Sequence, residues 1–190
     1  LAVVLTGTDL YRDIAADVQA RRSLDLAAVL VVLNERAPEA LPAPVRQKAH
    51  VVLQSAPARQ PVAKPASFLR AVMVGHLRDE KDPATLLRAV RLVRDDPAIR
   101  IDHIGAGLDS ALADAARDTM RTSPGYRWLG ALDHETTRRR IQRAHVLVHA
   151  SRMEGGAHVV IEAIRSGTPV IASRIDGNVG LLGPDYEGYF

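Results

Sequence analysis

Residues 151–168, SRMEGGAHVVIEAIRSGT, place two adjacent glycines between two apolar segments. The apolar run 146–150 precedes the glycines, and helix-forming residues follow them until Gly167. This order predicts a strand, a glycine turn and a helix. The first N–H groups of a helix lack backbone partners and carry partial positive charge, so such a turn can hold a phosphate oxygen. The stretch therefore predicts an anion site.

Two glutamates, Glu154 and Glu162, lie eight positions apart in this stretch. If most of the interval is helical, they are separated by roughly 12 Å. Carboxylates accept hydrogen bonds from hydroxyl groups and therefore suit the sugar and the ribose of a nucleotide sugar. The pair predicts one phosphate site with an acid on either side.

The composition is typical of a globular protein. Of the 190 residues 47% are hydrophobic and 25% charged, and a chain of this length buries roughly 70% of its unfolded surface. The longest apolar runs, 26–33 and 146–150, are far shorter than the roughly 20 residues of a membrane span. The chain contains no cysteine, which excludes disulfides and thiolate chemistry. We expect a cytoplasmic protein without a membrane span.

Charge and aromatic content argue against nucleic-acid binding. The net charge is only +3 and aromatic residues make up 4% of the chain, whereas nucleic-acid sites combine a basic patch with stacking aromatics. One basic cluster, Arg138, Arg139 and Arg140 with Arg143, falls on a polar helix face. We predict that this face is solvated. A non-catalytic module that binds nucleic acid or a sugar nucleotide is the alternative of a different class.

Both ends of the sequence suggest a piece of a longer chain. Residues 1–5 form an apolar, strand-like run without an initiating Met or a signal-peptide pattern. At the other end, the glycine-rich segment 177–188 predicts a turn that leads to Tyr189 and Phe190. We therefore expect a fold that is incomplete at both ends.

The first 56 residues predict about three strands and one helix. Residues 6–9 follow the first strand, at the end where open α/β sheets bind ligands. A helix is expected at 10–22, and Pro38, Pro42 and Pro44 should interrupt the chain later. The expected strands are 1–5, 26–33 and 50–54, the second of them fully buried.

The remaining residues alternate strands and helices regularly, which implies an α/β fold with a parallel sheet and right-handed crossovers. Asp82 should cap a helix that has Pro83 at its first position, and Asp133 should cap a second helix that runs through Ala144. The expected strands are 68–74, 99–104, 126–129, 146–149 and 169–172, and two further helices are expected at 108–120 and 159–166.

Residues 56–66 contain three prolines and no apolar period, so they predict a linker. We expect one domain at 1–56, a linker at 57–67 and a second domain at 68–190.

The loops that leave the strands of a parallel sheet emerge at one edge, so 75–81, 105–107, 130–133 and 152–156 should line one crevice. Arg78 and Lys81 suit a diphosphate there. Together the loops outline a nucleotide-sugar site. Each piece also has an ordinary explanation, because two glycines before a helix can be a simple turn and Lys81 can be a solvated surface charge.

Residues 68–182 resemble, in the order of their motifs, the donor domain of GT-B glycosyltransferases, particularly glycosyltransferase family 4. The resemblance implies a GT-B fold, in which two Rossmann-like domains face a cleft. It includes a pair of glutamates with seven intervening residues, matched by Glu154 and Glu162. The motifs are Val74-Gly-His-Leu77 with Lys81, Ile104-Gly-Ala-Gly107, Trp128-Leu-Gly130, Ser151-Arg-Met-Glu-Gly155, Glu162-Ala163 and Gly167-Thr-Pro-Val-Ile-Ala172.

The resemblance also implies roles for single residues. Glu154 would contact the donor hexose, Glu162 the ribose hydroxyls and Lys81, with Arg78, the diphosphate. The donor is implied to be a UDP-sugar, which is a substrate, and neither a cofactor nor a metal is expected. The residues implied in donor binding are Gly75, His76, Gly105, Gly107, Leu129, Leu132, Gly155, Gly156 and Glu162.

Some positions depart from the family pattern. The family commonly has Arg where this chain has His76, and its Glu-Gly-Phe-Gly reads Glu154-Gly-Gly-Ala157, followed by His158. With Leu5-Thr-Gly-Thr-Asp-Leu-Tyr11, these positions are similar to the selenosugar synthases of bacterial selenoneine biosynthesis. That resemblance implies a hexosyl transfer, from UDP-GlcNAc in particular, to selenophosphate. The implied acceptor-binding residues are Thr6, Gly7, Thr8, Asp9, Arg152 and His158.

Alternatives stay open at this point. A conventional glycosyltransferase with a hydroxyl acceptor and a UDP-sugar epimerase have the same donor motifs. Residues 6–9 can also be an ordinary helix N-terminus in which Asp9 satisfies backbone donors. His158 can equally be a residue that packs its helix.

Overall fold

The computed structural model describes residues 1–190, which form two compact units. The first unit contains Leu1–Ser55, Met153–His158 and Arg174–Tyr189, and the second contains Ala56–Arg152, Val159–Ser173 and Phe190. No helix is both long and apolar enough to cross a membrane. The expected linker, 57–67, groups with the second unit, and 153–158 and 174–189 of the expected second domain group with the first.

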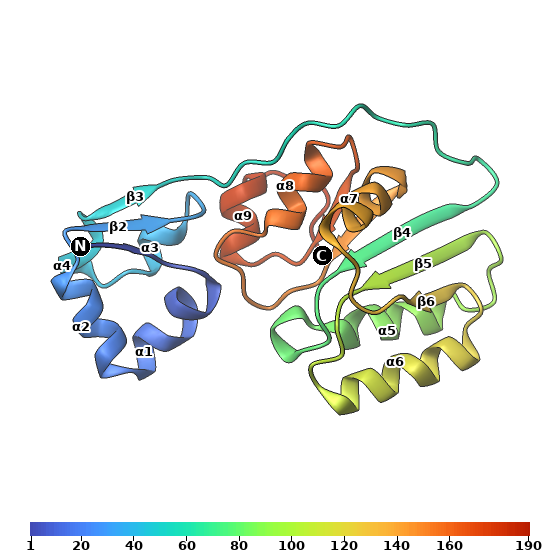
Figure 1. The fold of residues 1–190 in the computed structure, drawn as a ribbon, viewed down its shortest axis with the longest axis horizontal. Helices are drawn as coiled ribbons and strands as arrows, with labels where there is room; N and C mark the ends of the chain where they lie inside the picture. Colours follow the sequence, from blue (N-terminus) through green and yellow to red (C-terminus); the bar gives the residue numbers. More distant parts are fainter. The chain divides into compact units, whose positions relative to one another are not determined.

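The second unit is built on a five-stranded sheet in which every neighbouring pair is parallel (Figure 1). The strand order is β6-β5-β4-β7-β8, so consecutive strands are joined by crossovers that contain helices. The predicted α/β class and the five predicted strands are confirmed. The strands are β4 Leu69–Val74, β5 Ile99–Ile104, β6 Tyr126–Trp128, β7 Val146–His149 and β8 Val170–Ala172.

Helices cover this sheet on both faces. Figure 1 shows α5, Pro83–Leu92, and α6, Ser110–Thr122, together on one face, and α7, His134–Arg143, on the other. α8 is His158–Ile164. Leu87 of α5 and Met73 of β4 belong to one buried apolar cluster under α5 and α6. Burying such side chains stabilises the fold by about 1.5–3 kcal/mol each.

Aspartates start three of these helices, because their carboxylates accept from backbone N–H groups that lack helical partners. Asp133 accepts from Thr136 N at 2.8 Å at the start of α7. Asp82 accepts from Thr85 N at 3.3 Å, and Asp109 does the same for α6. The predicted caps at Asp82 and Asp133 are confirmed.

The first unit contains a smaller parallel sheet of order β1-β2-β3. Its core includes Leu30 and Val32 of β2 together with Leu10 and Leu24 from the helices. The strands are β1 Ala2–Val4, β2 Val29–Val32 and β3 Ala49–Val51, and the helices are the π-helix η1 Asp9–Asp13, α1 Ile14–Ala16, α2 Val18–Leu26, α3 Ala37–Ala40, α4 Ala43–Arg46 and α9 Asp176–Leu182.

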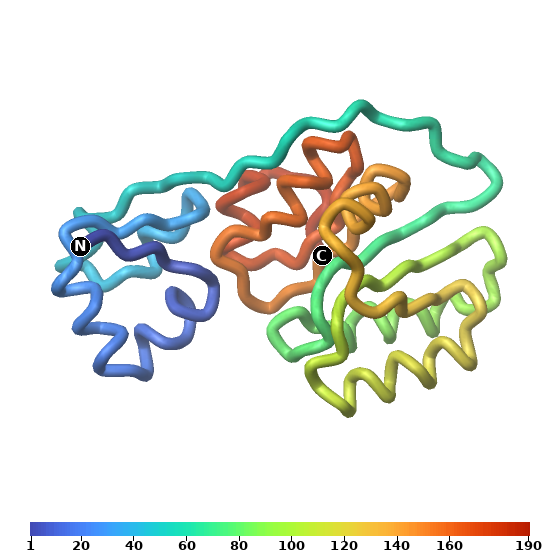
Figure 2. The backbone as a smooth tube through the Cα atoms, viewed as in Figure 1, coloured from blue at the N-terminus to red at the C-terminus, as the bar shows by residue number.

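Residues 52–65 have no helix or strand. Figure 2 shows residues 56–66 as an extended path that leads into β4. The prolines in this segment explain the absence of regular structure, because proline donates no backbone hydrogen bond.

Several predictions for the first unit and the end of the chain are wrong in detail. The helix expected at 10–22 is broken at Asp17, whose φ of −107° and ψ of 122° are extended, and α2 continues to Leu26. Leu26 is therefore helical, and β2 alternates buried and half-buried residues, so that 26–33 is not a fully buried strand. The prolines expected to interrupt the chain at 37–46 instead lie in the first turns of two short helices, α3 and α4.

The segment 177–188, expected to be a turn, begins as helix α9. Two of its glycines, Gly177 and Gly180, let buried neighbours approach the helix closely. A Cβ added to Gly180 would lie 2.2 Å from Asn34 Oδ1. Close packing, and not turn formation, accounts for this glycine.

Candidate functional site

The loops that leave β4, β5 and β6 meet at the carboxyl edge of the five-stranded sheet. Gly105 N donates to Gly130 O at 2.8 Å, and Leu77 N donates to Ala106 O at 2.9 Å. Trp128 Nε1 donates to Gly105 O at 2.8 Å. These hydrogen bonds join the three loops into one surface.

Gly105 is at the centre of this surface. A Cβ at this position would lie 2.0 Å from Gly75 O, so any other residue would separate the first two loops. His76 takes part through its ring, because Nδ1 accepts from Ala106 N at 3.0 Å. His76, which departs from the family pattern, thus holds the loop after β5 in place.

Beyond the carboxyl end of β4, Arg78 precedes the 3-10 helix η2, Asp79–Lys81, and Lys81 is its last residue. The Arg78 side chain is 45% exposed, with Nε 3.8 Å from Glu80 Oε2. The stem of Lys81 packs against Gly75, where a Cβ would approach Lys81 Cγ to 3.3 Å. Two cations therefore lie on the loop that precedes α5.

Arg152, predicted to bind an acceptor, is held by two carboxylates of the same loop. Its Nη1 donates to Asp79 Oδ1 at 2.6 Å and its Nη2 to Asp82 Oδ1 at 3.3 Å. Burial raises the pKa of Asp82. Hydrogen bonds from Thr85 and Arg152 lower it by more than burial raises it, so the pKa of Asp82 lies below its usual value. The hydrogen bond and charge of Asp82 raise the pKa of Arg152. An acceptor anion would have to share Arg152 with these partners.

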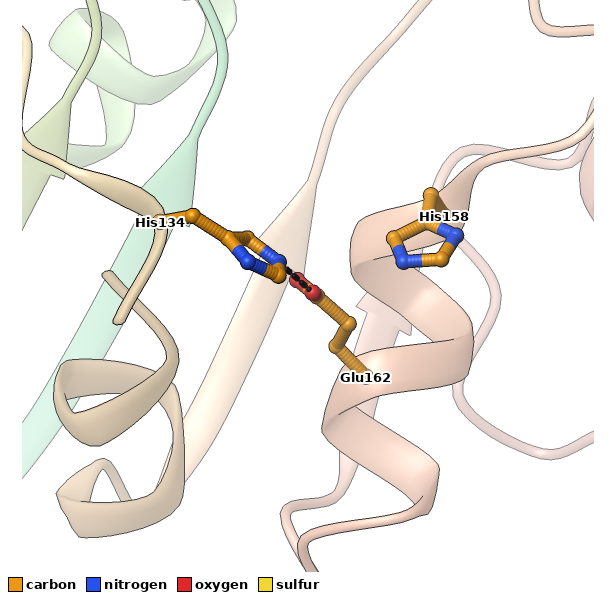
Figure 3. Close-up of side chains that lie close together, drawn as sticks. All are labelled: His134, His158 and Glu162. Carbon is orange, nitrogen blue, oxygen red and sulfur yellow. Dashed lines mark hydrogen bonds and ion pairs between the residues drawn. The ribbon is translucent and has the colours of Figure 1, made fainter. Parts of the chain in front are cut away.

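Glu162 lies on α8 with its side chain only 5% exposed. Figure 3 shows the ring of His134 directed toward its carboxylate, and His134 Nε2 lies 2.5 Å from Glu162 Oε1. Arg138 Nε is 3.6 Å from the same oxygen. His158, the first residue of α8, precedes Glu162 by one helical turn. A buried carboxylate beside a histidine and an arginine is the strongest polar feature of this region.

The prediction of a solvated arginine face on α7 is wrong for two of the four residues. Arg138 is buried, and its Nη2 donates to Pro57 O at 2.6 Å. Arg140 is half-buried and pairs with Asp102 at 3.2 Å. Only Arg139 and Arg143 are exposed. Residues one or two positions apart on a helix face different sides of it. The four arginines therefore do not form a continuous basic patch.

Glu154, Gly155 and Gly156 belong to the first unit. The Glu154 side chain is buried, and a Cβ on Gly155 would lie 2.5 Å from Gly7 N. Asn34 Nδ2 donates to Gly155 O at 2.7 Å. The first glycine of the pair thus makes a close backbone contact that no larger residue would allow.

The loop 6–9 is closed by its own aspartate. Asp9 Oδ2 accepts from Thr6 N at 2.9 Å and from Thr6 Oγ1 at 2.7 Å. This agrees with the simpler interpretation, in which Asp9 satisfies donors at a helix N-terminus. Thr8 makes no side-chain cap. The structure brings Gly7 beside Gly155, whereas the Thr6 hydroxyl is engaged within its own loop.

Three residues with notable contacts, His103, His134 and Asn34, lie outside the predicted site. His103 is buried on β5, with Nε2 3.1 Å from Gly75 O and Nδ1 3.0 Å from the Tyr126 hydroxyl. Burial lowers the pKa of His103 to about 4, so the imidazole is neutral at pH 7. Burial also raises the pKa of Tyr126. For His134 a signal existed, since it follows the cap Asp133 and shares a helix face with Arg138.

Residues 55–190 match the family described as "Glycosyl transferases group 1". The chain belongs to this family. The match includes all five strands of the second unit and the segment from Glu154 to Glu162. The motif-based resemblance to GT-B glycosyltransferases is therefore confirmed at the level of the family.

Curated relatives of this glycosyl transferases group 1 chain include a glycogen synthase from Mycobacterium tuberculosis, 34% identical over 122 residues, which are 63% of this chain and 28% of the relative. Another is the phosphatidylinositol N-acetylglucosaminyltransferase gpi3 subunit of Schizosaccharomyces pombe, 27% identical over 58% of this chain and 24% of the relative. The chain thus spans about a quarter of the length of these relatives.

Solved structures support the GT-B fold. S. aureus TarM, in a complex with Fondaparinux, alpha-GlcNAc-glycerol and UDP, has a TM-score of 0.74 at 17% identity, covering 100% of this chain and 40% of TarM. Anabaena Alr3699/HepE, in complex with UDP and glucose, has a TM-score of 0.74 at 16% identity, covering 100% of this chain and 57% of that protein. At these identities the likeness concerns the fold.

Proposed function

We propose that the chain is the donor-binding part of a glycosyltransferase that uses a UDP-sugar. The observation that carries the proposal is the buried Glu162 carboxylate, which lies on the helix after the glycine turn of a glycosyl transferases group 1 domain. The two solved relatives described above contain UDP together with a sugar compound, which supports uridine diphosphate as the nucleotide.

In this proposal each end of the donor has its own partner. Glu162 accepts from the ribose hydroxyls, and Glu154 from hydroxyls of the hexose. The backbone near Leu129 and Leu132 holds the base. Lys81 and Arg78 neutralise the diphosphate together with the loops of Gly75, His76, Gly105 and Gly107 and with the turn of Gly155 and Gly156.

The diphosphate gains negative charge as the glycosidic bond breaks. Cations and backbone N–H groups that face it therefore stabilise the transition state more than the ground state. Lys81 and Arg78 supply this stabilisation on the loop before α5. No protein nucleophile and no metal ion are needed in this scheme.

We propose selenophosphate as the acceptor and GlcNAc as the sugar. The selenium attacks C1 of the hexose, and UDP leaves with the electron pair of the C–O bond. Water then cleaves the Se–P bond of the product, which releases phosphate and the selenosugar. Support comes from Gly156-Ala-His158 and from residues 5–11, and the site for the anion would include Gly7, Thr6, Thr8, Asp9, Arg152 and His158.

A hydroxyl acceptor is the second candidate. The names of the curated relatives, a glycogen synthase and an N-acetylglucosaminyltransferase of phosphatidylinositol, favour it. A UDP-sugar epimerase is a further alternative for the same donor motifs.

UDP release from UDP-GlcNAc tests these candidates. Release that depends on selenophosphate, with a selenium-containing sugar in the mass spectrum, supports the proposed acceptor, whereas release only with a sugar acceptor supports the second candidate. Conversion of UDP-GlcNAc to its epimer without UDP release supports the epimerase.

Two substitutions test the donor roles. Glu162→Ala should weaken UDP itself, whereas Glu154→Ala should spare UDP and weaken the intact UDP-sugar. Glu135→Ala, on the exposed side of α7, is the matched control. Equal losses for both ligands in both variants would contradict the division of roles.

A further inference from the structure

The Glu162 carboxylate is fixed from one side by helix α7. His134 Nε2 lies 2.5 Å and Arg138 Nε 3.6 Å from Oε1. Both contacts therefore reach the same oxygen. Two partners on one side of the carboxylate fix the plane of the group.

The two α7 residues differ in how firmly they are held. The Arg138 side chain is 6% exposed, and its Nη2 donates to Pro57 O at 2.6 Å. The His134 side chain is 70% exposed and begins the helix directly after the cap Asp133. Because they are four residues apart, they share one face of α7. Arg138 is thus a fixed charge, and His134 is an accessible donor beside it.

We propose that His134 and Arg138 are positioning residues that orient Glu162 toward the ribose of the nucleotide. This inference rests on the proposed function, in which Glu162 accepts from the ribose hydroxyls. Arg138 compensates the charge of the buried carboxylate, since an unpaired charge there would be costly. His134 holds Oε1 so that the carboxylate faces the hydroxyl pair in one orientation.

A metal site is the competing explanation of the same groups. His134 and Glu162 offer an imidazole and a carboxylate, both of which are zinc ligands. The Arg138 guanidinium, 3.6 Å from Oε1, opposes a second cation at that oxygen. The charge of Arg138 therefore favours the positioning role.

The test compares UDP with 2′,3′-dideoxy-UDP, which lacks both ribose hydroxyls, by calorimetric titration of the whole chain. His134→Ala should weaken UDP about tenfold and leave the affinity for the dideoxy compound unchanged, because the effect passes through Glu162. His134→Gln, which keeps a side-chain donor, should recover most of the loss. Arg139→Ala, an exposed neighbour on α7, should change neither affinity.

Arg138→Ala should weaken UDP by a similar factor, again without effect on the dideoxy compound. Because Arg138 is buried, this variant can also lower stability, and circular dichroism is used to check that it is folded. The exposed His134 keeps the test valid if the Arg138 variant does not fold.

The outcomes separate this inference from the function on which it rests. If Glu162→Gln weakens UDP and the dideoxy compound equally, the ribose role of Glu162 is wrong. If Glu162→Gln discriminates between them but His134→Ala weakens both equally, the positioning role is overturned. Zinc binding that is lost in His134→Ala and that blocks UDP would also overturn it, in favour of the metal site.

Discussion

Two buried carboxylates of the second unit, Asp102 on β5 and Glu162 on α8, both pair with arginines of helix α7, yet they are arranged differently. The Asp102 side chain is 1% exposed. Arg127 reaches its Oδ1 at 2.7 Å, and Arg140 reaches its Oδ2 at 3.2 Å. Both oxygens of Asp102 therefore have an arginine partner.

Glu162 has a different surrounding. His134 and Arg138 approach one oxygen, Oε1, and the residue follows the glycine turn of a glycosyl transferases group 1 domain. Burial of a charge alone thus does not identify a functional group. The two carboxylates also differ in position: Asp102 lies on a strand of the sheet, and Glu162 lies on the helix that follows the glycine turn.

The largest effect is expected from removing both partners of Asp102. Arg127→Met with Arg140→Met leaves a buried charge without compensation, which should lower the free energy of unfolding by about 3–5 kcal/mol in urea denaturation. Adding Asp102→Leu should recover most of the loss. Arg139→Met, on the exposed side of α7, is the control and should change stability little. An unchanged stability of the double variant would show that Asp102 is not a structural charge.

Exchanging the two carboxylates for amides should give opposite results. Glu162→Gln is expected to weaken UDP by about 2–3 kcal/mol, roughly 30- to 200-fold, because hydrogen bonds to a charged acceptor are lost. Its effect on unfolding should be smaller than that of Asp102→Asn, because Arg138 keeps Pro57 O as a partner. Asp102→Asn should lower stability and leave UDP affinity unchanged. Calorimetry and denaturation of both variants measure the two quantities, and parallel changes would remove the distinction between the carboxylates.

His103, next to Asp102 on β5, extends the comparison to a buried group without a charge partner. Its pKa is about 4 in the folded chain, against 6.5 for the unperturbed group. The unfolded chain therefore binds a proton at higher pH than the folded one, and stability contributed by neutral His103 is lost as pH falls from 6.5 toward 4.

The expected loss between pH 7 and pH 5 is about 2 kcal/mol. His103→Gln should remove this part of the pH dependence. Urea denaturation of the unchanged protein and of the variant, each at a series of pH values, measures the difference. Parallel series for the two proteins would contradict the assignment of the neutral imidazole.

The smallest effect is expected at an aspartate near the edge of the sheet. Asp82→Ala removes the cap of α5 and one partner of Arg152, and should lower the free energy of unfolding by about 1 kcal/mol. Asp109→Ala, which removes the cap of α6 but touches no arginine of the site, is the matched variant. If only the Asp82 variant also changes the KM for the acceptor, Arg152 has a part in acceptor binding.

Local sequence signals predicted the second unit well. Apolar runs marked its five strands, and aspartates before Pro83 and His134 marked two helix starts, because these signals depend on neighbours in the chain. The first unit was harder. The break at Asp17 and the helical turns at 37–46 involve short elements, in which packing against the sheet overrides weak local preferences.

The motifs of the candidate site could be found in the sequence, but its contacts could not. The spacing of Glu154 and Glu162, the glycines between them and the family motifs were all visible in the sequence. The sequence did not show that Arg138 is buried, that Asp102 is paired or that His134 contacts Glu162. In each case a partner lies 28 or more residues away along the chain.

The sequence by itself determined the order of the strands and helices, the caps and the family to which the chain belongs, since these follow from local composition and motif spacing. The tertiary structure decided which charges are buried and what they pair with. Four arginines on one helix read alike in the sequence, and only the packing of α7 against β5 and α8 separates a fixed charge beside Glu162, a structural partner of Asp102 and two solvated residues.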